Sequence, residues 1–336
     1  YREVGIRAYV GPLIQDEPLM AGLPTGGKPQ FKEPYVRSLT DTFALMQEII
    51  QRFHRPQDGI SMMLAPTGPQ LCTDEMLKGC IELSDRHNLC RHTHLLETKA
   101  QKILASEKYG CSAVEHLQQI GFLNHQTSLA HCVWLDERDA QILAETGATA
   151  VHNPLSNLRL GSGIAPLLNY LATGVNVAFG CDGSASNDAQ DMLEVIKIGC
   201  ILQNVTTHEY QDWITPRVAI AMASLGGATG LGMADHLGTL EVGKQADLVL
   251  YDLTDLALLP CTDPIGLLVL GRSTQAVDSV WVKGDRIVAN GTLTTVDVNH
   301  LRQRLFEQSQ WMSDRIGVTL PKFEAQYRTV MNLPPL

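Results

Sequence analysis

Residues 90–102 read CRHTHLLETKAQK and place two histidines and a glutamate at the end of an apolar run. The segment CRHTHLL predicts a β-strand, and because side chains alternate along a strand, His92 and His94 point to the same face. Glu97 follows His94 by three residues, where the strand gives way to a loop, so its carboxylate can reach over the strand end. His92 lies one pleat earlier and also suits a core position. The stretch therefore predicts a polar site at the C-terminal end of a buried strand.

Apolar strands alternate with helices on both sides of this stretch. Strands are predicted at 4–11, 60–67, 90–96, 127–134, 148–154 and 175–182. Helices are predicted at 39–53, 73–87, 109–119, 136–145, 165–173, 188–204 and 216–231, and a loop rich in proline and glycine at 12–37. These six βα units are typical of parallel strands that helices cover on both faces. No glycine-rich phosphate fingerprint follows a strand, which argues against a dinucleotide-binding fold.

The pattern changes after about residue 235. Short strands with turn residues between them predict a small β-rich module, and residues 299–316 predict an amphipathic helix. We therefore divide the chain into an α/β unit at 1–235, a β module at 236–298, and a C-terminal helix and tail at 299–336.

Composition narrows the class of protein. The 336 residues are 44% hydrophobic and 18% charged, as in globular proteins, and the formal net charge is −10. Because no long basic block occurs, we expect neither a nucleic acid nor a membrane as partner, and a homo-oligomer stays open. The eight cysteines form no CxxC pair and most lie in apolar runs, which predicts a cytoplasmic protein with reduced thiols. No apolar run is long enough to predict a membrane span.

Four consecutive predicted strands end in a polar side chain, namely His94, His131, His152 and Asp182. A single histidine at a strand end is more often a hydrogen-bonded packing residue than a ligand. Four in succession favour a site, because the C-terminal ends of barrel strands are where catalytic groups gather. Imidazole and carboxylate groups are the ligands that a divalent metal such as zinc takes.

The residue types also predict a reaction. A metal lowers the pKa of bound water to about 7, and Asp182 can both bind the metal and accept the proton of that water. Glu97 can deliver a proton to a ring nitrogen, and His131 can orient the hydroxide or stabilise an oxyanion. This set suits hydrolytic displacement at a carbon flanked by ring nitrogens.

The motifs HTHLLET, SLAHCVWLDERD, HNPLSNLRLGSGIAP, GCDGSASND and LGTLEVGKQADLVLYDL resemble the amidohydrolase superfamily, in the branch of cytosine deaminase, guanine deaminase and triazine hydrolase. They occur in the family's order between about residues 90 and 252. The resemblance implies an α/β fold, a TIM-type (β/α)₈ barrel with a small β-sandwich module. It also implies one divalent metal, zinc first and iron as the alternative.

The same resemblance implies a role for each site residue. His94 corresponds to the family's metal ligand on strand 5, and Glu97 to the proton-shuttling glutamate beside it. His131 corresponds to the histidine of strand 6. Asp182 corresponds to the aspartate of strand 8, which binds metal and handles the proton. Metal ligands are therefore expected at His94 and Asp182, and catalytic roles at Glu97, His131 and Asp182.

Two departures from the family pattern lead to further expectations. The HxH pair of strand 1 is absent, so strands 1 and 2 are expected to be missing from this chain and to be encoded upstream. A gap should then separate the strands at 4–11 and 175–182, and the chain expressed alone should be insoluble or free of metal. Relatives that deaminate adenosine-like thioether nucleosides carry a histidine where Thr67 stands and an arginine near Pro12, which speaks against that substrate class.

The resulting hypothesis is a metal-dependent enzyme that deaminates an amino-substituted N-heterocycle of the purine, pterin, pyrimidine or triazine type by hydrolysis. One alternative is hydrolytic removal of another group, such as halide from a triazine-like ring. An alternative of another class is a metal-free scaffold of the same fold that binds a partner.

Other polar residues near the motifs are assigned structural roles. Ser156, Asn157, Ser184 and Asn187 are expected to cap helices or shape loops. Arg91 alternates with the two histidines of its strand, so its side chain is expected to face away from them in an ion pair.

Overall fold

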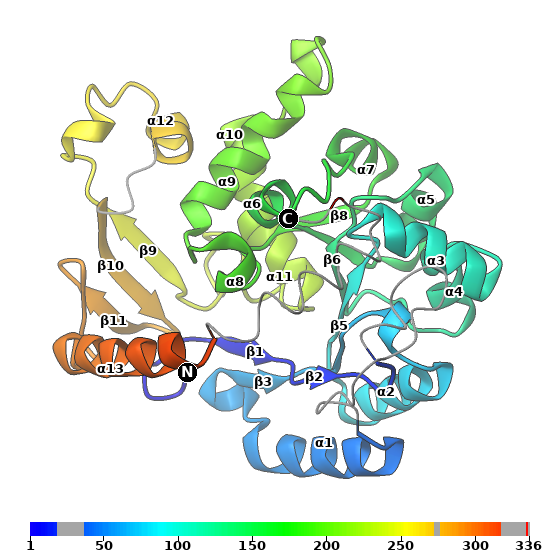
Figure 1. Cartoon of the computed structure of the whole chain (residues 1–336). Helices are drawn as coiled ribbons and strands as arrows, with labels where there is room; N and C mark the ends of the chain where they lie inside the picture. Colours follow the sequence, from blue (N-terminus) through cyan, green and yellow to red (C-terminus); the bar gives the residue numbers. More distant parts are fainter. Residues whose placement is uncertain (19–36, 272–275, 317–333, 335–336) are drawn as a thin grey trace.

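The computed structural model describes residues 1–18, 37–271, 276–316 and 334, and Figure 1 shows parallel strands flanked by helices, with a second sheet at the left. The parallel strands are β1 (Ala8–Val10), β2 (Leu13–Ile14), β3 (Ile60–Met62), β4 (Ala65–Pro66), β5 (Arg91–Leu95), β6 (Thr127–His131), β7 (Thr149–His152) and β8 (Asn176–Phe179). β1 pairs with β3, β2 pairs with β4, and β5 to β8 form a four-stranded sheet in chain order. A parallel bridge between Leu64 and Arg91 connects the short pairs to β5. The fold is therefore α/β with parallel strands.

Among the described residues, the parallel strands do not form a closed ring of hydrogen-bonded pairs. Within the described residues, β1 pairs only with β3, and β8 pairs only with β7. In the part of the chain that the structure describes, β1 and β8 are therefore not paired with each other, as the expected gap between the strands at 4–11 and 175–182 requires.

Helices follow the strands along the chain. They are α1 (Leu39–Phe53), α2 (Asp74–His87), α3 (Lys99–Tyr109), α4 (Ala113–Gln119), α5 (Glu137–Thr146), α6 (Pro154–Arg159), α7 (Leu167–Thr173), α8 (Ser184–Asn187), α9 (Met192–Ile201), α10 (Pro216–Ala221), α11 (Gly227–Gly230), α12 (Pro264–Gly271) and α13 (Val298–Ile316). A π-helical turn, Met222–Gly226, connects α10 and α11 into one helical segment. Among the described helices, none combines the length and the apolar character that a membrane span requires.

The helix predicted at 109–119 corresponds to α4 and includes only the last residue of α3, which was otherwise not predicted. The hydroxyl of Thr98 accepts a hydrogen bond from the amide of Gln101 and starts α3 ten residues before the predicted start. Ser112 and Glu115 form a capping box that starts α4. Capping side chains thus define boundaries that apolar periodicity alone did not reveal.

Three further predictions need correction. The loop at 12–37 contains strand β2, while its part at 19–36 lies outside the described residues. The helix predicted at 188–204 begins at Met192, because the carboxylate of Asp191 caps it by accepting from two amides. Helix α12 lies between β9 and β10, in a segment for which no helix was predicted.

The strands β5, β6 and β7 contribute buried side chains to the hydrophobic core. Leu95, Leu129 and Ala150 are buried, as expected for strands covered on both faces. Arg91 is only 2% exposed; its guanidinium pairs with Asp85 and donates to the carbonyl of Phe122 at 2.9 Å. The ion pair predicted for Arg91 is therefore confirmed.

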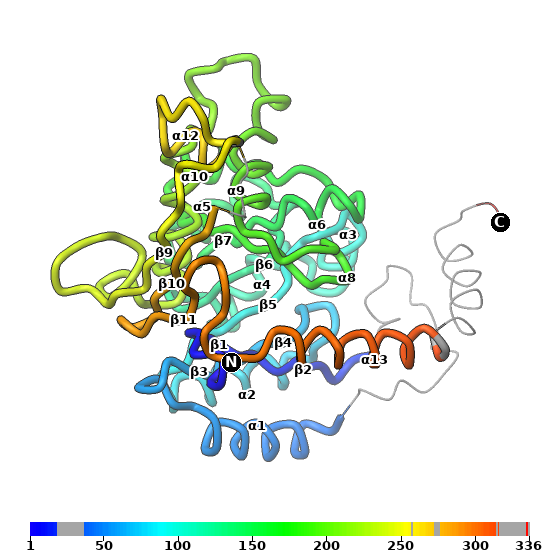
Figure 2. Tube along the Cα trace, turned by 90° about the vertical axis from the view of Figure 1, so that its left-hand side faces the viewer, coloured from blue at the N-terminus to red at the C-terminus, as the bar shows by residue number. Residues whose placement is uncertain are grey.

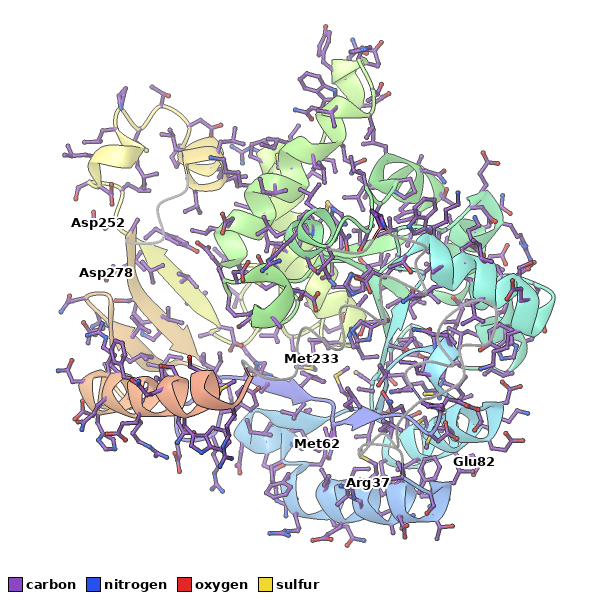
Figure 3. All side chains as sticks on the ribbon, in the orientation of Figure 1. Arg37, Met62, Glu82, Met233, Asp252 and Asp278 are labelled. Carbon is purple, nitrogen blue, oxygen red and sulfur yellow. The ribbon has the colours of Figure 1, made fainter. Side chains whose placement is uncertain are left out.

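The second sheet is antiparallel. Its strands β9 (Leu248–Tyr251), β10 (Val277–Val282), β11 (Asp285–Ala289) and β12 (Thr292–Leu293) lie in the order β12-β11-β10-β9. Figures 1 and 2 show that α13 begins near the N-terminus. In Figure 3 the labelled Asp278 lies on this sheet and Asp252 follows the end of β9, whereas Met62 lies on the parallel strands. An ion pair between Arg7 and Asp247, with N and O 2.6 Å apart, connects the two sheets.

Candidate metal centre

Three of the four polar side chains at strand ends come together. His94 lies near the end of β5, His131 at the end of β6, and Asp182 three residues after β8. Each offers one ligand atom, and these atoms all lie within 4.8 Å of one another. The imidazole rings of His94 and His131 are stacked, with centroids 5.4 Å apart and planes at 19°. One ion at about 2.0–2.2 Å from each ligand requires these atoms to lie no more than about 4.4 Å apart, so they could meet at one ion after a small shift.

Both rings are oriented through Nδ1. His94 Nδ1 lies 2.5 Å from the carbonyl oxygen of Thr67, which can only accept, so this nitrogen carries the proton. His131 Nδ1 lies 2.9 Å from Oδ1 of Asn157. In each ring Nε2 is then the nitrogen that remains for a metal or a reacting group. Such a partner on the second nitrogen is the usual arrangement for metal-binding histidines.

Asp182 is held by two hydroxyl groups. Ser156 Oγ donates to Asp182 Oδ2 at 2.5 Å, and Ser186 Oγ donates to the same oxygen at 2.7 Å. Burial raises the pKa of Asp182, but hydrogen bonds from Ser156, Ser186 and the amide of Gly183 outweigh it and leave the pKa below its usual range. The carboxylate is therefore ionised at neutral pH, as a metal ligand must be.

Glu97 lies beside the cluster. Its Oε1 accepts from Ser162 Oγ at 3.2 Å, and its Oε2 is 3.9 Å from Nε2 of His131. The amide of Glu97 donates to Oε1 of Gln101 at 2.7 Å, which fixes the backbone below the carboxylate. A carboxylate so placed can exchange a proton with a molecule bound above the metal ligands.

The backbone at the strand ends is unusual. Leu96, His131, Cys132 and Asp182 have positive φ values of 46°, 73°, 51° and 62°, although none is glycine. Each such residue costs on the order of 1–3 kcal/mol, and clusters of them occur at functional sites. His131 and Asp182, which have this conformation, belong to the cluster. Nothing in the sequence signals this conformation.

Two histidines stay outside the cluster. His92 Nδ1 lies 2.8 Å from Ser128 Oγ, and the side chain borders a cavity of about 470 Å³. Burial, followed by the neighbouring His94 and His131, lowers the pKa of His92 to about 4. His152 is buried at the end of β7, and neither ring nitrogen has a hydrogen-bond partner among the described residues. His152 therefore shares the strand-end position of the cluster but not its ligand set.

Sequence reasoning missed the residues that support the site. Ser156 and Asn157 were expected to shape loops, but they hydrogen-bond to Asp182 and His131. The available signal was the motif HNPLSNLRLGSGIAP, which carries Ser156, Asn157 and Ser162 within one short segment. By contrast, the amide of Asn187 donates to the carbonyl of Cys181, which is the structural role expected of it.

In sequence, the chain is similar to known proteins. A sequence model described as the Amidohydrolase family matches residues 3–287. The chain is 37% identical over 251 residues to a 5-methylthioadenosine/S-adenosylhomocysteine deaminase of Desulforudis audaxviator, covering 74% of this chain and 58% of that protein. A second protein of that description, from Syntrophobacter fumaroxidans, is 32% identical over 90% of this chain and 66% of its own length. The chain thus spans less than two thirds of both.

Solved structures give the same fold. An adenosine deaminase from Xanthomonas campestris with bound zinc superposes with a TM-score of 0.82 at 30% identity, covering 94% of this chain and 67% of that one. The zinc complex of an atrazine chlorohydrolase from Arthrobacter aurescens superposes with a TM-score of 0.82 at 24% identity, covering 90% of this chain and 66% of that one. The second likeness concerns the fold alone.

Proposed function

The chain belongs to the amidohydrolase family, and on that premise we propose that its protein is a metal-dependent aminohydrolase, which removes an amino group from an N-heterocycle by hydrolysis. The observation that carries the proposal is the convergence of His94, His131 and Asp182 within 4.8 Å. Glu97, with Oε2 3.9 Å from His131, adds an acid–base group at the same place.

The donor set supports a divalent metal at this centre, and zinc is the ion we propose, with iron as the alternative. His94 and Asp182 would hold it, because each keeps one donor atom free of the hydrogen bonds that orient it. When bound, the metal supplies Lewis acidity that makes water acidic enough to react at neutral pH.

The remaining steps belong to the side chains. Asp182, ionised through its hydrogen bonds, accepts the proton of the attacking water. Glu97 donates a proton to a ring nitrogen of the substrate, which makes the adjacent carbon electrophilic. After water has added there, the proton on Asp182 passes to the amino group, the C–N bond breaks and ammonia leaves, while the hydroxyl proton of the adduct returns to Glu97. His131, held through Nδ1, presents Nε2 to the attacking oxygen and orients it.

The substrate is a heterocycle that carries an amino group next to a ring nitrogen, of the purine, pterin, pyrimidine or triazine type. The relatives' names favour adenosine-like nucleosides, contrary to the expectation drawn from Thr67 and Pro12. Thr67 itself contributes its carbonyl to His94 and its hydroxyl to the carbonyl of Ile14, at 3.2 Å. Because both hydrogen bonds of Thr67 are structural, its presence does not argue against adenosine-like nucleosides. These nucleosides therefore belong in the first set of substrates to test.

The architecture that we propose is a TIM-type barrel with a small β-sandwich module. The barrel would comprise residues 1–235, the module residues 236–298, and the C-terminal helix and tail residues 299–336. The parallel strands, the antiparallel sheet and the likeness to the zinc-bound adenosine deaminase support this division.

The test is ammonia release from a panel of purines, nucleosides, pterins, pyrimidines and triazines by zinc-loaded protein. Asp182→Asn should abolish turnover, because it removes a ligand charge and the proton acceptor together. Glu97→Gln should retain zinc and lose about 10²–10⁴-fold in kcat. Glu107→Gln, an exposed change on α3, is the matched control and should behave as wild type.

Two results would contradict the proposal. Full activity in Glu97→Gln would exclude ring protonation and favour displacement of another leaving group, such as halide. A full-length protein that takes up no zinc and releases no ammonia from the panel would favour the metal-free binding scaffold.

A further inference from the structure

The turn after α6 has a backbone conformation that favours glycine at two positions. Gly161 and Gly163 have φ values of +68° and +123°, in the left-handed region that favours glycine. A Cβ atom on Gly163 would lie 3.0 Å from Cγ1 of Val133. The two glycines therefore specify the place of the residue between them, Ser162.

All three polar groups of Ser162 are engaged. Its amide donates to the carbonyl of Asn157 at 2.8 Å, and its carbonyl accepts from Nε1 of Trp134 at 2.9 Å. Its hydroxyl donates to Oε1 of Glu97 at 3.2 Å, and the residue is only 5% exposed. Because the backbone is held on both sides, the hydroxyl approaches Glu97 from a fixed point.

We propose that Ser162 is a positioning residue for Glu97, an inference that rests on the proposed function. Glu97 stands in a loop, so its carboxylate would otherwise sample several rotamers. The hydrogen bond on Oε1 selects the rotamer in which Oε2 lies 3.9 Å from His131. Asn157, which holds His131, belongs to the same segment, so one segment sets both partners.

The test is kinetic. Ser162→Ala should lower kcat by about tenfold. A distance of 3.2 Å is long for an O–H···O hydrogen bond, so the energy of this bond should lie at the lower end of the range for a charged acceptor. The KM and the zinc content should not change, since neither depends on the proton that Glu97 donates. Ser162→Thr keeps the hydroxyl and should restore most of kcat. Ser309→Ala, the same change at an exposed position of α13, is the control.

A double-mutant cycle separates positioning from a structural role. In a Glu97→Gln background, Ser162→Ala should cause no further fall in kcat, because the group that it positions is already lost. A tenfold fall that persists in this background would overturn the inference, and so would a wild-type kcat in Ser162→Ala.

If Ser162→Ala does not fold, Trp134→Phe tests the same inference by removing the indole N–H that holds the carbonyl of Ser162. Its kcat should fall in the wild-type background and not in Glu97→Gln, and equal falls in both would overturn the inference. A wild-type protein that releases no ammonia overturns the proposed function itself. An active wild type with an unaffected Ser162→Ala overturns only the role of Ser162.

Discussion

Replacing Ser156 by alanine should weaken metal binding without touching a metal ligand. Ser156 Oγ donates to Oδ2 of Asp182 at 2.5 Å, and only Ser186 gives a second hydroxyl to that oxygen, at 2.7 Å. In Ser156→Ala one of these hydrogen bonds is lost. The pKa of Asp182 should then rise toward its ordinary value, and the carboxylate should be less firmly oriented.

The magnitude follows from the kind of bond. A hydrogen bond to a charged group contributes about 1.5–3 kcal/mol, which corresponds to about 10- to 150-fold in an equilibrium constant. Asp182 is partly exposed and keeps its bond to Ser186, so the lower end applies. Ser156→Ala should therefore weaken zinc binding by about tenfold, in the range known for partners of metal ligands.

The assay is competition for zinc between the protein and a chromophoric chelator at neutral pH. Ser184→Ala is the matched control, because Ser184 is exposed on the short helix that also carries Ser186. The control should bind zinc like wild type. A correctly folded Ser156→Ala protein with unchanged zinc affinity would refute the reasoning.

Three further predictions concern stability. Tyr170→Phe leaves the carbonyl of Cys132 without the 2.5 Å hydrogen bond that it accepts, so the free energy of unfolding in urea should fall by about 1–3 kcal/mol; an unchanged value would contradict this. Burial lowers the pKa of His152 to about 3, so as the pH falls the unfolded chain binds a proton before the folded protein does. The free energy of unfolding should therefore decrease below about pH 6.5, by up to about 1.4 kcal/mol per pH unit. His152→Leu should reduce that slope by the contribution of one group, because His92, whose pKa is also lowered, still contributes; an identical slope in the variant would show the assignment to be wrong. Burial raises the pKa of Asp247, but the hydrogen bond from Arg7 outweighs it and the net pKa is lowered. Asp247→Asn should thus cost stability above about pH 4, a difference that vanishes as the pH falls through the lowered pKa; a difference that persists in acid would argue against the ion pair.

The sequence by itself indicated most of the strands and helices and the positions of the candidate site residues. Apolar runs of strand length, separated by helical periodicity, indicated a parallel α/β arrangement, because strands buried on both faces must be apolar throughout. A polar residue at the end of such a run stands out for the same reason. His94, His131 and Asp182 could therefore be found without a structure, together with Glu97.

Tertiary structure alone decided how these residues meet. The parallel register sets Leu95 opposite His131, which brings a residue 37 positions after His94 beside it. His131 and Asp182, which belong to the cluster, have a left-handed backbone, at a local cost that only the surrounding packing can sustain. The hydroxyls of Ser156 and Ser162 reach their carboxylates across the fold. Local propensity contains no information about such contacts, because they depend on how separate segments pack. This is why Ser156, which was expected to cap a helix or shape a loop, was not recognised as a partner of Asp182.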